Sequence, residues 1–499
     1  MTNEQFSSPS ASFWHREVES IQFPKLEQEL KSEIVVVGGG IAGILSAYEI
    51  AKSGKEVILV EARSFIHGTT GNTTAKLSAQ HHLIYNQLIE KYEEKKARLY
   101  YDANMEGIQQ IKKLTEEYQI ECDLRRDDAF VYATEKSSVA AIEKEAKAYE
   151  ALEIDGGLTN KLPVDLEIAA AVVMHNQYTF HPVDFLQGIL SQLMKMDVKL
   201  YENTVVEKVE ENEDVVITTM DGNKIHCEKA VCTTHYPIFD PEKYYTKHME
   251  PEMSFATAYE TETPFPGGMY ISYDQPRRTF RNMLRDDKEY ILVGGGSHTP
   301  GDGSSDLSRY EEIYHFATEH FNVEKVLTHW SSHDYMTEDC MPFIGFGGKE
   351  TKNILVATGF SKWGLANAAT GAVLINDLVN EQENRYQSLF NPFRFIPKLE
   401  KETNEDQINY PSSIQIEKEN NLSNLQAMTY ETEDDEKIGV FQDAEGQRHH
   451  LNLSCTHLGC SVGWNDGDKT WDCPCHGSRF AATGEVLAGP ATHPLKKMK

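Results

Sequence analysis

Two short segments near the C-terminal end each combine cysteine with histidine, and they constrain the fold more than any other feature of the chain. The first is Cys455-Thr456-His457-Leu458-Gly459-Cys460, and the second is Cys473-Pro474-Cys475-His476-Gly477-Ser478. Crowded cysteines with interleaved histidines indicate a metal site. Each segment offers one thiolate and one imidazole at the tip of a loop. Two sulfurs suit one iron of a [2Fe–2S] cluster and two neutral nitrogens suit the other, whereas a structural zinc ion is the alternative that the same residue types allow.

Both segments closely resemble the two boxes of the Rieske family, and the resemblance covers about residues 425 to 499. It implies that Cys455 and Cys473 bind one iron and that His457 and His476 bind the other. The proline and glycines around the second box fit this family better than they fit a zinc site.

The same resemblance implies further features of the two loops. Cys460 and Cys475 match the cysteines that form a disulfide between the loops in the respiratory-complex type, so we expect that bond here. Ser478 matches a hydroxyl that hydrogen-bonds to a cluster sulfide. Phe480 stands where the family often has tyrosine. One hydrogen bond is therefore missing, and we expect a lower reduction potential than in the members with tyrosine.

A glycine-rich turn near the N-terminus separates a predicted strand, residues 34–37, from a predicted helix. A second strand, residues 57–60, ends at Glu61. In such a unit Gly38 permits the tight turn, Gly40 lets a pyrophosphate approach the backbone, and Gly43 allows close helix–strand packing. Glu61 would bind the ribose hydroxyls. The unit predicts a dinucleotide site, although this motif alone does not distinguish FAD from NAD.

Further segments resemble the glycine oxidase/D-amino-acid oxidase-like flavoproteins across about residues 32 to 390. They are Gly68 to Lys76, Phe180-His181-Pro182, Val205-Val206, the stretch from Trp330 through Asp334, Asp339 and Pro342 to Gly345, and Thr358 to Gly364. The resemblance implies that the cofactor is FAD. It adds a second set of cofactor-binding residues: Thr70, Thr74, Lys76, Val206, Gly359 and Gly364. In this family the last helix N-terminus points at the N1–C2=O edge of the flavin.

The order of elements predicts an α/β chain with a small all-β domain at its end. Residues 1–31 form a lead-in, and residues 32–391 form the FAD-dependent oxidoreductase. The resemblance to the flavoprotein family implies that in this part a Rossmann-like FAD-binding domain is interleaved with a mostly antiparallel β substrate domain. Residues 392–425 form a linker, and residues 426–499 form the Rieske domain. We expect helices at 81–118 and 364–380, and strands at 168–173, 199–209, 215–219, 230–233 and 354–357.

Gly294-Gly295-Gly296 also follows a predicted strand, as a nicotinamide site would require. The residues after it, from Ser297 to Gly303, form a loop pattern rather than a helix. We therefore find no fold for NAD(P)H, which weakens any interpretation as an NADH-driven reductase.

The sequence says less about residues that contact a substrate. Arg281, together with Arg277 and Arg278, lies in the strand-rich middle segment. In the flavoprotein family an arginine on such a strand often holds a substrate carboxylate through two hydrogen bonds. We assign this catalytic role to Arg281, with an ordinary salt bridge as the alternative. His81 and His82 follow the segment from Gly68 to Lys76. Some members of the flavoprotein family attach flavin covalently through histidine.

Composition limits the partners of the protein. The 499 residues are 40% hydrophobic and 25% charged, which is typical of folded chains with two or three domains. The formal net charge of −30 argues against nucleic acid, because phosphate binding needs clustered lysine and arginine. No secretory signal is apparent, and the longest apolar run, near residues 34–47, is shorter than the roughly 20 residues of a membrane span. We expect a cytoplasmic protein without a membrane span.

Together these features predict a dehydrogenase of amines or amino-acid-like compounds. Hydride would pass from a C–H beside nitrogen to flavin, and single electrons would then pass to the cluster and to an external acceptor. One alternative is a flavin-linked reductase that receives electrons through the cluster. Another is a redox-sensing electron-transfer protein. The substrate, the external partner and the oligomeric state do not follow from the sequence.

Overall fold

The computed structural model describes residues 5–6, 10–16, 18, 20–261, 263–285, 288–300, 305–395, 422–432 and 436–498. Most of the predicted linker, residues 392–425, and part of the predicted lead-in lie outside the described residues. The predicted boundaries at 391 and 426 therefore stay predictions.

The first large sheet has the strand order β16-β17-β10-β1-β2-β7, and β8 and β9 extend it beside β10. Its parallel centre forms because residues 34–37 and 57–60 are short apolar runs that are buried on both faces. The strands are β1 (Leu30–Val37), β2 (Val57–Val60), β7 (Lys199–Tyr201), β8 (Val206–Glu211), β9 (Val215–Thr219), β10 (Lys224–Cys232), β16 (Phe343–Phe346) and β17 (Ile354–Thr358).

One predicted strand, residues 199–209, is wrong as a single element, since the structure divides it into β7 and β8. Glu202 causes the break, because its buried carboxylate accepts hydrogen bonds from the backbone N–H of Phe65 at 2.7 Å and of Phe23 at 3.1 Å. Asn203 then takes a left-handed conformation, with φ of +50°. The chain turns here and leaves the sheet edge.

Helices cover this sheet, and α1 packs directly on α8 and α5. The helices of this half are α1 (Ile41–Lys52), α3 (Ile84–Tyr118), α5 (Pro182–Lys195), α8 (Gly364–Val379) and α9 (Gln387–Phe390). The sequence analysis missed α5, although His181 accepts a capping bond from the backbone N–H of Asp184 and Pro182 opens the first turn.

The second large sheet has the order β15-β11-β14-β13-β12-β4-β6-β3, with β5 beside β6. It is antiparallel except where β12 pairs with β4. Its strands are β3 (Lys76–Leu77), β4 (Arg125–Ala133), β5 (Gly156–Thr159), β6 (Ala170–Thr179), β11 (Met249–Thr261), β12 (Met269–Ser272), β13 (Arg278–Arg285), β14 (Lys288–His298) and β15 (Val323–Thr337). These strands alternate along the chain with those of the first sheet, so the predicted interleaving of two domains is confirmed.

Helices α4 (Val139–Ala151) and α7 (Asp306–His320) pack on the second sheet. Short helical segments lie in the connections: η1 (Phe13–His15), α2 (Gly68–Gly71), η2 (Lys136–Ser138), η3 (Pro241–Lys243) and α6 (Tyr244–His248). None of the described helices has the length and apolar character that crossing a membrane would require.

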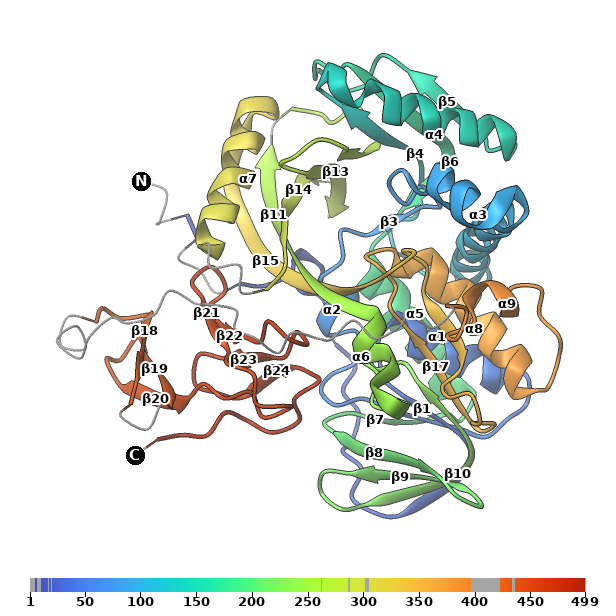
Figure 1. The fold of residues 1–499 in the computed structure, drawn as a ribbon, viewed down its shortest axis with the longest axis vertical. Coiled ribbons are helices and arrows are strands. Elements are labelled where there is room, and N and C mark those ends of the chain that lie inside the picture. The colour runs from blue at the N-terminus through green and yellow to red at the C-terminus, as the bar shows by residue number, and fades with distance from the viewer. Residues whose placement is uncertain are drawn as a thin grey trace.

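The C-terminal domain is all-β, as predicted. One sheet contains β18 (Gln426–Glu431), β19 (Lys437–Gln442) and β20 (Arg448–Asn452), and the other contains β21 (Gly463–Asn465), β22 (Thr470–Asp472), β23 (Arg479–Ala481) and β24 (Val486–Ala488). It has its own core around Trp471 and Phe480. Figure 1 shows this domain in red beside β15 and the N-terminal end of α7, which both belong to the half with the second sheet.

Candidate functional site

The glycine-rich turn connects β1 to α1 as tightly as its sequence predicts. Gly38 has φ of +112°, a conformation that other residues rarely adopt. A Cβ on Gly43 would lie only 1.8 Å from the carbonyl oxygen of Gly38, so the helix can approach the strand only with glycine here. Gly40 precedes the first residue of α1 and has no side chain to keep an anion from the N–H groups of the first turn that follow Ile41.

Glu61 lies at the end of β2 and faces the same turn. Its carboxylate accepts hydrogen bonds from the backbone N–H of Gly39 at 2.7 Å and of Arg63 at 2.9 Å. Burial raises the pKa of this carboxyl above its usual value. A buried carboxylate that still has free acceptor positions can receive the hydroxyls of a ribose.

The segment of residues 70–74 crosses the N-terminal end of α1. The Thr70 hydroxyl oxygen accepts a hydrogen bond from the backbone N–H of Ile41 at 3.1 Å. Three long side chains donate hydrogen bonds to successive carbonyl oxygens of this segment. They are Trp330 to Asn72 at 2.9 Å, Trp14 to Thr73 at 2.6 Å and Arg281 to Thr74 at 2.9 Å. The segment is thereby held in place beside the glycine-rich turn.

These elements surround a cavity of about 1370 Å³. All the predicted cofactor-binding residues line it except Gly43, which packs inside the turn, and Gly359, which precedes the lining segment at the start of α8. Those that line it are Gly38, Gly40, Glu61, Thr70, Thr74, Lys76, Val206 and Gly364. The cavity therefore fits an elongated dinucleotide, with glycine backbone and a helix N-terminus for its phosphates and a carboxylate for its ribose.

The prediction that Arg281 holds a substrate carboxylate finds no support in this geometry. Its guanidinium is buried against the Trp14 ring, 5.3 Å from the ring centre, and does not line the cavity. It instead positions the segment of residues 70–74. Arg278 pairs with Glu312 at 3.1 Å, whereas Arg277 does line the cavity.

His81 and His82 also line the cavity, beside Trp363. The His81 ring stacks on Trp363 at 4.7 Å, and its two nitrogens are engaged by the Tyr100 hydroxyl and the Ser78 carbonyl oxygen, both at 2.7 Å. His81 therefore has no nitrogen left for a covalent bond to flavin. Lys76 donates to the carbonyl oxygen of Tyr270 at 3.0 Å, and burial lowers its pKa to about 7.

The sequence analysis did not identify the polar group around Lys362 on the cavity wall. The Lys362 ammonium donates to the Glu252 carboxylate at 2.5 Å and to the hydroxyls of Ser254 and Ser297, both at 2.8 Å. Asp334 lines the same cavity, and burial raises its pKa to about 6. The cavity wall thus has two carboxylates from the second sheet, Glu252 and Asp334, and one ammonium from the β17–α8 connection, Lys362.

The four predicted cluster ligands come together at the tips of two loops of the C-terminal domain. Cys455 and Cys473 are both buried and have free thiols. The rings of His457 and His476 lie 5.0 Å apart, and each buries an Nδ1 atom that has no hydrogen-bond partner among the described residues. Burial lowers the pKa of His457 to about 4, so its imidazole is neutral, as ligation requires. Two thiols and two unpartnered imidazole nitrogens fit a [2Fe–2S] cluster.

The expected disulfide between Cys460 and Cys475 is present and joins the two loops. The hydroxyl oxygen of Ser478 accepts a hydrogen bond from the backbone N–H of Ala491 at 3.0 Å and is buried. Phe480, which replaces the tyrosine of other members, packs in the core of the domain.

The C-terminal domain also forms part of the cavity wall. His457 and residues 486–492 line it together with the glycine-rich turn. The Arg63 guanidinium donates to the carbonyl oxygen of Val486 at 3.1 Å, next to Glu61. A predicted cluster ligand and the predicted FAD site therefore share one cavity.

A buried ionic group joins the C-terminal domain to α7 and β15. The Asp468 carboxylate accepts hydrogen bonds from the Tyr310 hydroxyl at 2.6 Å, from the Ser331 hydroxyl, and from Arg479 of its own domain at 2.8 Å. Asp466 accepts from the backbone N–H of Leu307 at 2.9 Å, at the start of α7. Because these charges are paired and desolvated, they fix the position of the domain.

Replacing Asp306 with asparagine should make this junction less sensitive to pH. Burial and the nearby carboxylates of Asp472, Asp468 and Asp466 raise the pKa of Asp306 from 3.8 to about 8. Arg309 is a cationic neighbour that lowers it, and the His298 ring lies 3.3 Å away. The native state therefore keeps a proton that the unfolded state releases, and stability falls as the pH rises from about 4 to 8. Between pH 6 and 8 the wild type should lose about 2 kcal/mol through this group.

Urea unfolding at pH 6 and 8.5, followed by the visible circular dichroism of the cluster, measures this effect. Asp306→Asn should show the smaller loss, whereas Asp165→Asn, which alters an exposed carboxylate, should behave as wild type. Equal losses in the wild type and in Asp306→Asn would contradict the prediction.

Comparison with known families agrees with both halves of this site. The family model "FAD dependent oxidoreductase" matches residues 33–378, and the model "Rieske [2Fe-2S] domain" matches residues 413–499. The chain belongs to the FAD-dependent oxidoreductase family. It is an enzyme of that family with a C-terminal Rieske domain, and its cofactors are FAD and a [2Fe–2S] cluster.

Individual relatives are similar to the whole chain or to its larger part. A Bacillus subtilis (strain 168) protein named as a Rieske 2Fe-2S iron-sulfur protein, YhfW, is 37% identical over 100% of this chain and 99% of its own length. Gamma-glutamylputrescine oxidoreductase of Escherichia coli (strain K12) is 23% identical over 74% of this chain and 88% of its own. The crystal structure of L-proline dehydrogenase from P. horikoshii has a TM-score of 0.61 and 20% identity, and covers 73% of this chain and 98% of that one.

Proposed function

We propose that the protein is a dehydrogenase that oxidises an amine or an amino-acid-like compound and passes single electrons through its cluster to an external acceptor. The observation that carries this proposal is the shared cavity, because His457 lines the same space as Gly38 and Glu61. When bound there, flavin would take a hydride from a C–H beside nitrogen, and the cluster would carry the electrons away singly.

The residues of the cavity wall support a nitrogen-containing substrate. Glu252 and Asp334 present carboxyl groups that attract an amine, and Arg277 could receive a substrate carboxylate. Two groups have a pKa that burial moves toward neutrality, Lys76 to about 7 and Asp334 to about 6. Either can accept the proton that an ammonium substrate must lose before its oxidation. The name of gamma-glutamylputrescine oxidoreductase is in keeping with this class of substrate.

Anaerobic visible spectroscopy tests the proposal. Amino acids, N-methylated amines and polyamines are added separately, and then NADH and NADPH. We expect one amine to bleach both the flavin and the cluster bands, and neither nicotinamide to bleach them. Bleaching by NAD(P)H alone would overturn the proposal and would make the protein a reductase. Reduction of the cluster by ferredoxin, followed by reduction of the flavin, would favour electron flow in the opposite direction.

A further inference from the structure

The loop that carries the second cluster box contacts two residues at the end of β15. The Tyr335 hydroxyl donates a hydrogen bond to the carbonyl oxygen of His476 at 2.6 Å. The His333 ring packs against Gly477, where an added Cβ would lie 2.8 Å from the ring. Any larger residue at Gly477 would therefore push the loop away from β15.

Tyr236 contacts both predicted histidine ligands. Its ring centre lies 5.7 Å from that of His457 and 5.8 Å from that of His476, with interplanar angles of 74° and 70°. Its hydroxyl hydrogen-bonds to that of Thr246, which fixes the far end of the ring. Edge-to-face packing of this kind restricts both imidazole rings at once. Tyr236 also lines the cavity.

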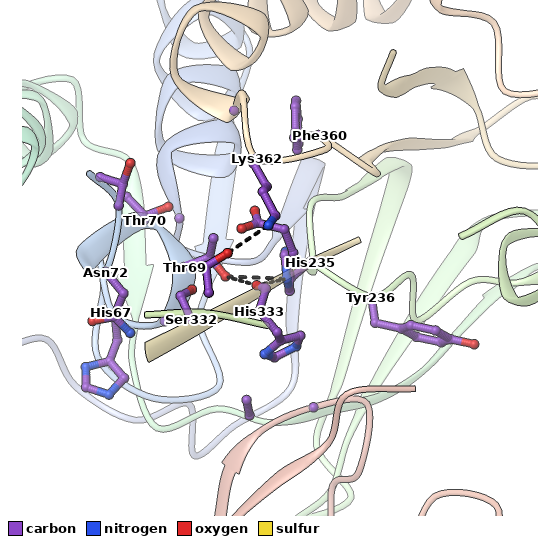
Figure 2. A pocket seen from close by; sticks show the side chains of 18 of the residues that line it. His67, Thr69, Thr70, Asn72, His235, Tyr236, Ser332, His333, Phe360 and Lys362 are labelled. Carbon is purple, nitrogen blue, oxygen red and sulfur yellow. Dashed lines mark hydrogen bonds between the residues drawn. The ribbon is translucent and has the colours of Figure 1, made fainter. Parts of the chain in front are cut away.

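His235, the residue before Tyr236 in the chain, extends this packing toward Thr69 of α2. Its Nε2 lies 3.0 Å from the carbonyl oxygen of His333, which also accepts a hydrogen bond from the Thr69 hydroxyl at 3.1 Å. Its ring centre lies 4.6 Å from that of Tyr335. Figure 2 shows His235 and His333 near Thr69 of α2, and Tyr236 on the side of the pale red ribbon of the C-terminal domain. Packed side chains thus connect the cavity wall to the cluster loops.

The geometry points to Tyr236 as the positioning residue that fixes the two histidine ligands against the FAD cavity, so that electrons pass between flavin and cluster while the C-terminal domain stays docked. This inference rests on the proposed function for its two redox partners. With both cofactors bound, one electron would leave the reduced flavin in each transfer and one ferric iron would become ferrous. The external acceptor would reoxidise the iron between the two transfers, and the substrate protons would leave to solvent. Tyr236 itself is neither oxidised nor reduced.

The test compares Tyr236→Leu with Tyr236→Phe in the full-length protein loaded with FAD and cluster. Tyr236→Phe keeps the ring and loses only the bond to Thr246. Tyr236→Leu removes the surface on which both imidazole rings pack. The flavin is reduced by a laser flash with EDTA as electron donor, and the appearance of the reduced cluster is followed in the visible spectrum. The electron paramagnetic resonance spectrum of the dithionite-reduced cluster is recorded separately.

We expect Tyr236→Leu to slow the transfer about tenfold or more, since small displacements of positioned groups have effects of this size. Its resonance spectrum should also shift or broaden, whereas Tyr236→Phe should match the wild type in both measurements. Tyr310→Phe removes a different contact of the domain, the hydrogen bond to Asp468, without touching either histidine, so it should leave the resonance spectrum unchanged. The FAD and iron contents of each variant confirm that it has folded.

A wild-type transfer rate and an unchanged spectrum in Tyr236→Leu would overturn the inference. A slowed transfer with an unchanged spectrum in both Tyr236→Leu and Tyr310→Phe would also overturn it, because docking alone would then explain the result. The flash needs no organic substrate. Failure of every amine to reduce the flavin would therefore count against the proposed function and not against Tyr236.

Discussion

Replacing Cys473 with alanine will yield a protein that binds FAD and contains no iron–sulfur cluster. The thiols of Cys473 and Cys455 are both free and buried, and one thiol cannot hold an iron that needs two. The FAD cavity is formed mainly by the other domain, so the flavin absorption should remain. Iron and acid-labile sulfide analysis should show a complete loss of both. Substrate should then bleach the flavin without any cluster signal.

Cys227→Ala provides the matched control. Cys227 is also a buried free thiol, but it lies in β10 of the first sheet, outside the cluster loops. This variant should keep the wild-type content of iron and sulfide. Retention of iron and sulfide in Cys473→Ala would show that the ligand set is wrong. If the wild type contained zinc instead of iron, the site would be the structural zinc site that the same residue types allow.

Local sequence patterns were sufficient wherever a site depends on neighbouring residues. The turn from Gly38 to Gly43 and its acidic partner Glu61 lie within one strand–helix–strand unit, and the structure forms this unit as predicted. The two cluster loops were found in the same way. Each box is one short continuous segment, so the spacing of its cysteine and histidine ligands can be read directly from the sequence.

Contacts between distant segments could not be predicted in this way. The direction of Arg281 depends on the register of β13, since side chains alternate between the two faces of a strand. Its burial beneath the segment of residues 70–74 has no local signal. Asp468 and Arg479 form a buried ion pair, and Asp468 also accepts hydrogen bonds from Tyr310 of α7 and Ser331 of β15, which no local pattern predicts. His235 and Tyr236 follow a parallel strand, where ligands often bind, and that position could have identified them.

Replacing Gly40 with valine will abolish FAD binding and leave the cluster in place. Gly40 precedes α1, and a Cβ there would already lie 3.0 Å from the Thr70 hydroxyl oxygen. The branched side chain would project in front of the helix N-terminus and keep a pyrophosphate from its N–H groups. Each lost hydrogen bond to a charged phosphate costs about 1.5–3 kcal/mol, which is about 10- to 100-fold in affinity. Flavin content and a fluorescence titration with FAD measure the change.

Gly222→Asn is the control for the exchange of a glycine in the same half of the protein. Gly222 lies in the turn between β9 and β10 with φ of +84° and no atom within 4 Å of an added Cβ, and asparagine tolerates that conformation. This variant should bind FAD as the wild type does. A Gly40→Val protein that keeps its iron and still binds FAD with wild-type affinity would place the pyrophosphate elsewhere. It would also separate the cavity shared with His457 from the dinucleotide site, and so remove the structural basis for electron transfer between the two cofactors.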